Sequence, residues 1–168
     1  TMSNQEVLTR DLMKEMNIES LLSVTASDIE VLKELATVRA FMGQFTILKV
    51  SMQPSEGDNK GHIAMQYRAD AIIEQEETNP HKLPDAEEGA IFTERFYPGY
   101  GIQRLAQIMG HCSPEGTTLM QFIESAEGIN FHAMVRAKSR KDQDTKEVRY
   151  FNELDVFSMI GPMTPVEE

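Results

Sequence analysis

The side chains most able to do chemistry in this sequence are basic, and they gather between positions 136 and 149. Arg136, Lys138 and Arg140 recur at every second position, so a β-strand would carry all three on one face. More cations follow within the same stretch: Lys141, Lys146 and Arg149. A row of cations neutralises successive phosphates, so this stretch is predicted to bind a nucleic acid.

Aromatic side chains supply a second kind of contact. Phe151 shares a strand face with Arg149, and Tyr97 and Tyr100 flank a Pro-Gly turn. Unstacked nucleobases bind to such rings by stacking, so these three rings are predicted to contact bases. The apolar alternation assigns other rings to the interior of the protein: Tyr67, Phe96 and Tyr150.

No pattern typical of catalysis or of metal binding accompanies these residues. The single cysteine, Cys112, excludes an internal disulfide, and no histidine stands beside a recognisable nucleophile or a metal-ligand partner. Charged residues in strands usually face water, which is the expectation for Glu94, Arg95, Glu153 and Asp155. The sequence therefore predicts a protein that is not an enzyme and that needs no metal and no cofactor.

The first forty residues are predicted to be helical. Ser3 with Glu6, and Ser27 with Glu30, are capping-box pairs that precede apolar residues at helical spacing. They predict two short helices, at residues 4–16 and 28–38. This extension, residues 1–40, is expected to pack on the remaining domain or to mediate self-association.

After Gly43 the apolar period changes from helical to two, which is typical of strands. A loop at residues 75–89, rich in acidic residues and proline, separates the second strand from the third. The predicted strands cover residues 44–52, 63–73, 90–97, 131–140 and 148–157, with short helices at 102–110 and 119–126. Residues 161–168 form a tail.

This order of elements leads to a family resemblance. The segments GQFTILKVSM, HIAMQYRADAIIE, YGIQRLAQIMG, GINFHAMVRAKSRKD and EVRYFNELDVFSMI resemble successive pieces of the small OB-fold single-stranded DNA-binding proteins of bacteriophages. The resemblance covers residues 41–160. It implies an α+β, mainly β fold: a five-stranded OB-like antiparallel barrel with a helical insertion between strands three and four, preceded by the two N-terminal helices.

The resemblance also implies a function. Such proteins coat single-stranded DNA during replication or recombination with little sequence preference, and they contact replication proteins. No stretch approaches the roughly 20 apolar residues of a membrane span, so the expected location is the cytoplasm, or the host cytoplasm if the protein is viral.

The charge balance is also compatible with other functions. The net charge is −11, so the basic stretch would also suit an ordinary solvated strand face. The acidic balance and amphipathic helices are compatible with a protein-binding module, such as a secretion chaperone or a phage-encoded inhibitor. A cone-shaped α+β fold that encloses a small ligand is a third alternative; it predicts a deep central cavity.

Overall fold

The structure is a computed structural model that describes residues 8, 10–25, 37–58 and 60–162. Its contacts divide the chain into two compact units, Thr1–Glu34 and Leu35–Glu168, which are considered separately. Within the described residues, no helix combines the length and the apolar character that crossing a membrane requires.

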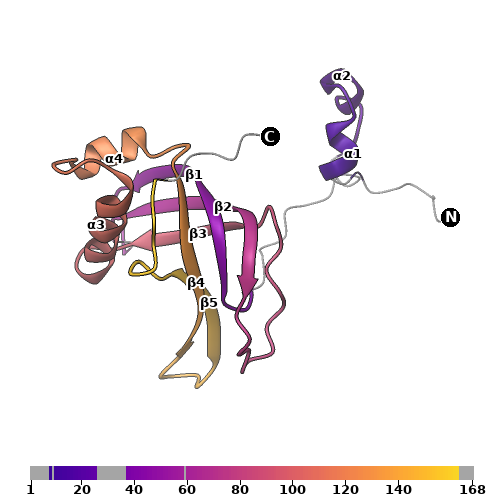
Figure 1. Ribbon diagram of the computed structural model, residues 1–168. Coiled ribbons are helices and arrows are strands. Elements are labelled where there is room, and N and C mark those ends of the chain that lie inside the picture. The colour runs from indigo at the N-terminus through magenta and orange to yellow at the C-terminus, as the bar shows by residue number, and fades with distance from the viewer. Residues whose placement is uncertain (1–7, 9, 26–36, 59, 163–168) are drawn as a thin grey trace. The chain divides into compact units, whose positions relative to one another are not determined.

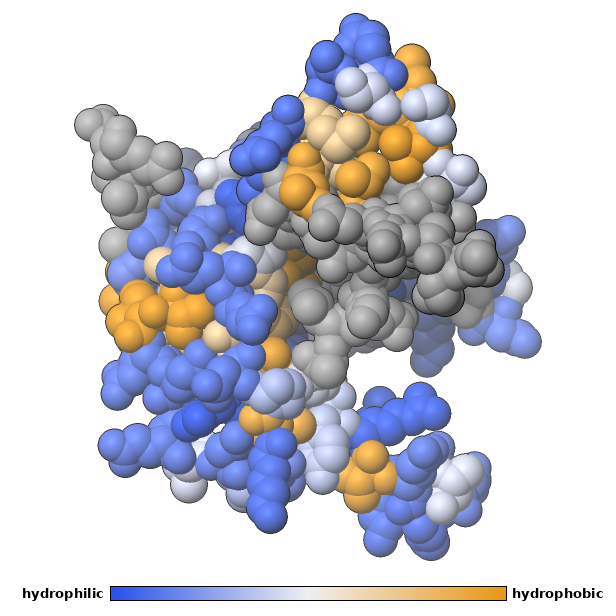
Figure 2. Space-filling view, turned by 90° about the vertical axis from the view of Figure 1, so that its right-hand side faces the viewer, coloured by the Kyte–Doolittle hydropathy of each residue, from blue (hydrophilic) through white to orange (hydrophobic). Residues whose placement is uncertain are grey.

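The N-terminal unit contains two short helices, α1 (Arg10–Lys14) and α2 (Ile18–Leu21). The prediction of one continuous helix to residue 16 was wrong: α1 stops earlier, and Asn17 starts α2 by accepting the N–H of Ser20 through its side chain. Hydrophobic side chains of this unit are visible at its surface in Figure 2, and Leu22 is 78% exposed. Most of the helix predicted at residues 28–38 lies outside the described residues, and residues 37 and 38 are not helical.

The second unit is mainly β. Five antiparallel strands form one curled sheet in the order β3-β2-β1-β4-β5 (Figure 1). The strands are β1 (Phe41–Gln53), β2 (His62–Gln75), β3 (Ile91–Phe96), β4 (Asn130–Lys141) and β5 (Val148–Leu154). The predicted sequence of strands and helices from Phe41 onward is confirmed.

Irregular pairing between β1 and β2 accompanies the curl of the sheet. Their register shifts at three places, after Met42, after Gln44 and after Ile47. Such bulges bend strands and increase their twist. Gly43 lies at the first shift, where a Cβ would stand 2.9 Å from the carbonyl oxygen of Ala71, so this close approach requires glycine.

Two helices between β3 and β4 cover one opening of the curled sheet (Figure 1): α3 (Tyr100–Cys112) and α4 (Leu119–Ser125). The apolar stripe of α3 buries Leu105 and Ile108. A capping box formed by Thr118 and Gln121 starts α4, which buries Phe122. Both helices therefore present their apolar faces to the inner face of the sheet.

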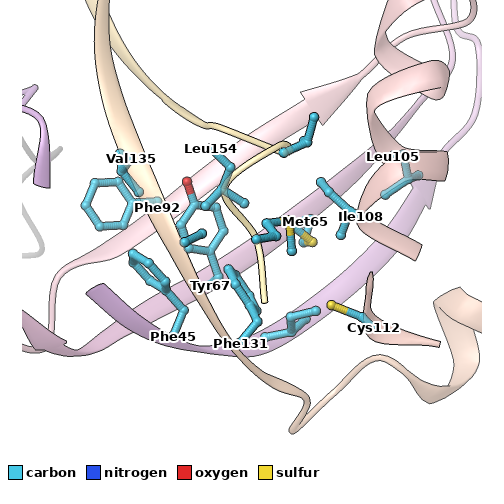
Figure 3. Close-up of a cluster of buried hydrophobic side chains, with 14 of the residues drawn as sticks. Phe45, Met65, Tyr67, Phe92, Leu105, Ile108, Cys112, Phe131, Val135 and Leu154 are labelled. Atoms are coloured by element: carbon cyan, nitrogen blue, oxygen red, sulfur yellow. The ribbon is translucent and has the colours of Figure 1, made fainter. Parts of the chain in front are cut away.

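Side chains fill the interior (Figure 3). The rings of Phe45 and Phe131 stack with centroids 5.2 Å apart, and Tyr67 meets Phe45 edge-on at 5.4 Å. Tyr67 and Phe96 are fully buried, which confirms that both belong to the core. A filled interior leaves no room here for the central ligand cavity that a cone-shaped binding fold predicts.

The end of β5 differs from the prediction. The strand stops at Leu154, and residues 155–158 turn before Ile160 pairs with His132 in an isolated bridge. Asp155 explains the stop, because its side chain accepts the N–H of Phe157 and its carbonyl accepts the N–H of Ser158.

Candidate nucleic-acid interface

The basic stretch forms a two-stranded hairpin that extends beyond the rest of the sheet (Figure 1). The first residue of β1, Phe41, pairs with Val135 of β4, so residues 136–141 of β4 pair only with β5. Thr37, Val38 and His81 contact β5 at residues 150–152, but the cations of the extension are exposed. We call residues 136–153 the basic hairpin.

The register of the hairpin determines which side chains share a face. Arg136 lies opposite Glu153, Lys138 opposite Phe151, and Arg140 opposite Arg149. Directly opposed residues in a sheet project to the same side. The basic hairpin thus has a cationic face, which carries these six residues.

Two of the predicted phosphate contacts are already engaged by carboxylates. Arg136 donates to Asp155 Oδ2 through Nε and Nη2, each at 2.9 Å, and Lys138 pairs with Glu153. Both cations are nearly half exposed, so these pairs contribute little to stability. The expectation that Asp155 and Glu153 simply face water was wrong, and Arg136 and Lys138 are partly neutralised.

The cations at the tip are different. Within the part of the chain that the structure describes, Arg140, Lys141, Lys146 and Arg149 form no salt bridge. All four are exposed. These four residues, here called the tip cations, are therefore free to contact an external anion.

A turn at residues 142–147 joins the two strands of the hairpin. The Asp142 carboxylate accepts the backbone N–H groups of Asp144 and Thr145, at 2.8 and 3.0 Å. The N–H of Thr145, followed by that of Asp144, lowers the pKa of Asp142 below its ordinary value, because each hydrogen bond favours the charged form. The carboxylate of Asp142 thereby serves the turn, while Asp144 and Glu147 remain exposed anions beside the tip cations.

The two neighbouring rings of β5 lie on opposite faces of the hairpin. Phe151 lies on the cationic face and is 39% exposed. Tyr150 lies on the face that continues the core, as predicted, but its ring packs against His81 with centroids 4.7 Å apart and it too is 39% exposed. Tyr150 remains exposed because the hairpin has already left the core.

The acidic loop, residues 76–90, borders the Tyr150 face. It is shaped by hydrogen bonds that Asn79 makes with Leu83 and that Gln75 makes with Ala86. Two shallow hollows, of about 220 and 300 Å³, lie where the loop and the end of β2 meet β4, and Glu76 lines both. The second hollow is lined by Met134, which shares a strand face with Arg136, so its carboxylates border the cationic face near Arg136. The tip cations are therefore the better binding surface for a polyanion.

The predicted tyrosines are not part of the basic hairpin. Tyr97 follows β3 and Tyr100 begins α3; they are 43% and 70% exposed. Tyr97 stacks loosely on His62, with ring centroids 4.8 Å apart. Phe96 pairs with Ile63 near the start of β2, whereas the hairpin lies beyond the end of β2, so the structure places these tyrosines away from the tip cations.

Two further cations, Lys49 and Arg95, were not predicted as binding residues, although Arg95 is exposed as expected. Lys49 pairs across the sheet with Gln66, which pairs with Thr93, and Arg95 lies two residues further along β3. All four side chains are exposed on the outer face, and Lys49 and Arg95 form no salt bridge with any described residue. The two-residue period of β3 could have indicated this, because it places Thr93 and Arg95 on the face opposite to Glu94.

Buried charges join the two ends of the sheet, where β3 and β5 form no ladder. Glu94 accepts hydrogen bonds from Arg104 Nη2 at 2.9 Å, from the Tyr67 hydroxyl at 2.9 Å and from the Leu154 N–H at 3.1 Å. Arg104 also donates to the Leu154 carbonyl at 2.8 Å. These side chains, the seam cluster, replace the missing backbone hydrogen bonds between the strands.

The seam cluster corrects the expectation that Glu94 faces water, since the residue is only 7% exposed. Burial raises the pKa of the Glu94 carboxyl because the charged form is poorly solvated, although Arg104 opposes this effect. Burial and the adjacent carboxylate likewise raise the pKa of Tyr67 well above its ordinary value. These groups are buried and bond β3 and α3 to Leu154 of β5, so the seam cluster has a structural role.

No group of three or more histidine, cysteine or acidic side chains in the described residues is arranged to hold a metal ion. Comparisons with protein-family models, with curated protein sequences and with solved structures found no match to this chain.

Proposed function

We propose that this protein binds single-stranded DNA through the cationic face of the basic hairpin, with little sequence preference and without catalysis. One observation carries the proposal: the four tip cations, of which Arg140 and Arg149 lie on the cationic face, form no salt bridge in the described structure, although the chain as a whole carries a charge of −11. When protein cations neutralise phosphates, the counterions condensed on the nucleic acid are released, which favours binding. Phe151 adds a ring on the same face.

The fold is compatible with this function. The strand order, the helices between β3 and β4 and the seam without a ladder are what a partly open five-stranded OB-type barrel would contain. In OB-folds, the face of strands two and three and the loops after strands one and four bind oligonucleotides. Here Gln66, Thr93 and Arg95 lie on that face, and the turn of the basic hairpin is the loop after strand four.

A single strand fits these contacts better than a duplex. Stacking on Phe151 needs a base whose face is free, and bases in a duplex already stack on one another. Cations and rings contact phosphates and the faces of bases, which are common to all sequences, so little sequence preference is expected. By its family resemblance, the protein would coat single-stranded DNA during phage replication or recombination, in the cytoplasm of the host.

Fluorescence anisotropy tests this proposal. A labelled oligothymidylate is titrated with the protein at low and at moderate salt, and a labelled duplex of equal length is the control. We expect tighter binding to the single strand and a clear loss of affinity as salt rises. Absence of salt-sensitive binding to either probe eliminates the proposal.

A protein-binding module is the second candidate. The pairing of Arg136 and Lys138 with carboxylates and the adjacent acidic loop favour it. The exposed apolar residues Ile18 and Leu22 of the N-terminal unit also favour it. Such residues suit contacts with a second copy of the chain or with another protein. Dimerisation measured by analytical ultracentrifugation, together with no affinity for DNA, would favour this function.

A further inference from the structure

Phe157 is the most exposed large hydrophobic side chain in the described part of the chain, at 83%. It lies in the turn that ends β5 and makes no ring contact with another described aromatic residue. Leaving a phenylalanine in water forgoes the stabilisation that burial gives. The ring is therefore available to a ligand.

Hydrogen bonds fix the backbone on both sides of this ring. Asp155 Oδ1 accepts the N–H of Phe157 at 3.0 Å, and the Asp155 carbonyl accepts both the N–H and the hydroxyl of Ser158. The Ser158 hydroxyl in turn accepts the N–H of Met134 at 2.8 Å. A ring on such a held turn loses little freedom when it binds a ligand.

The turn is linked to the cationic face. Asp155 holds Phe157 through Oδ1 and Arg136 through Oδ2. The side chain of Arg136 is 47% exposed, so one carboxylate binds both an exposed cation and the backbone of the residue that carries the exposed ring. A nucleotide offers the matching pair, a phosphate and a base.

The turn and Tyr97 follow the two strands that the seam cluster joins. All neighbouring strands are antiparallel, so β3 and β5, at the two ends of the order, run in the same direction. Glu94 meets Leu154 across the seam, and Tyr97 and Phe157 each follow three residues later. Beyond the turn the chain continues in the direction of β5, because Leu154 pairs with Val135 and Ile160 pairs with His132, three residues further along β4. Phe157 and Tyr97 therefore both lie beyond the seam cluster in the same direction.

From this placement we infer that Phe157 is a stacking ring for a nucleobase of the bound single strand, next to the cation Arg136 and on the side of the seam where Tyr97 lies. The inference rests on the proposed function and extends it, because it lengthens the binding surface from the basic hairpin to the turn after β5.

A tryptophan reporter tests the inference, because the natural chain contains none. Phe157→Trp places one indole in the turn, and Met120→Trp, at a 58% exposed position on α4, is the matched control. We expect oligothymidylate to quench the fluorescence of Phe157→Trp strongly and that of Met120→Trp little. Phe157→Ala should weaken binding about tenfold, with an unchanged circular dichroism spectrum.

The outcomes separate the inference from the function on which it rests. If the parent binds the oligonucleotide while Phe157→Trp is not quenched and Phe157→Ala keeps parental affinity, the inference is overturned and the proposed function stands. If the parent does not bind, both fall.

Discussion

The seam cluster and the tip of the basic hairpin carry charge on or beside the same strand, yet they use it in opposite ways. At the seam, Glu94 and Arg104 are each 7% exposed and hydrogen-bond to each other and to Leu154. At the tip, the four cations are exposed and form no salt bridge with any described residue. A buried charge needs an oppositely charged partner within the protein. An exposed charge is solvated by water and can bind an external ligand.

Glu153 marks the transition between the two regions. One of its carboxylate oxygens pairs with Arg104 of the seam cluster, and the other pairs with Lys138 on the cationic face. Along β5, the buried charges that stabilise the fold and the exposed cations that can bind a ligand are therefore only a few residues apart. The comparison predicts that substitutions at the seam change stability, whereas substitutions on the hairpin change binding.

The largest effect is expected from Arg104→Leu. The change leaves the Glu94 carboxylate buried with only Tyr67 and the Leu154 N–H as partners. Removing one partner of a buried ion pair costs about 3–5 kcal/mol, so the free energy of unfolding, measured with urea, should fall by that amount. Gln107→Leu, at an exposed position of the same helix, should change it by less than about 0.5 kcal/mol.

Equal losses in these two variants would show that the seam cluster does not hold β3 to β5. A loss for Arg104→Leu alone supports the structural role of the cluster.

The next effect concerns stacking. Phe151→Ala should weaken binding of single-stranded DNA by about 1–3 kcal/mol while the salt dependence stays the same, because a ring and not a charge is lost. Tyr150→Ala is a matched control, since both residues are 39% exposed but Tyr150 lies on the opposite face. Anisotropy titrations at two salt concentrations measure both properties. A larger loss for Tyr150→Ala would mean that the DNA lies on the other face.

A smaller effect, of opposite sign, is expected from Glu153→Gln. The change releases Lys138 to contact a phosphate, so affinity for DNA should rise, and the slope of log K against log salt should become steeper by about 0.7. Glu115→Gln removes the same charge from an exposed site outside the hairpin and should leave that slope unchanged. An unchanged slope for Glu153→Gln would contradict the idea that Glu153 restrains Lys138.

The smallest effect concerns the access of water to α3 near the seam cluster. Cys112, on the same helix as Arg104, is buried, and burial raises the pKa of its thiol to about 11. The thiolate is the reactive form, so iodoacetamide at mildly alkaline pH should modify Cys112 only after unfolding in urea. Rapid modification of the folded protein would show that water reaches the site.

The raised pKa of Cys112 also determines how the free energy of unfolding depends on pH. An unfolded thiol ionises near pH 8.5, well below the pKa of about 11 in the fold. The unfolded state therefore gains stability from ionisation first, and the free energy of unfolding should fall as the pH rises above about 8.5. Cys112→Ala should remove this part of the pH dependence.

Much of the sheet could be predicted from the sequence, because strand alternation is local. The same alternation predicted that Arg136, Lys138 and Arg140 share a face, and that Tyr67 and Phe96 lie inside. It failed for Glu94, although Phe92 and Phe96 flank it on the same face. The partner that makes its burial tolerable is Arg104 on α3, and a contact between a strand and a helix leaves no local pattern in the sequence.

The ion pairs on the cationic face could not be predicted from the sequence either. Arg136 meets Asp155, and Lys138 meets Glu153, only because the hairpin adopts one particular register. A shift of one residue would exchange the faces and separate these charges. The number of cations that remain free is therefore a property of the fold.

The most direct test of the central claim compares the salt dependence of DNA binding between the parent and a variant in which all four tip cations are alanine. If these cations contact phosphates, the variant should bind far more weakly, and the magnitude of its slope of log K against log salt should fall by up to about 3, or about 0.7 for each contact. A variant that binds with the parental affinity and slope would show that the tip of the basic hairpin does not bind nucleic acid.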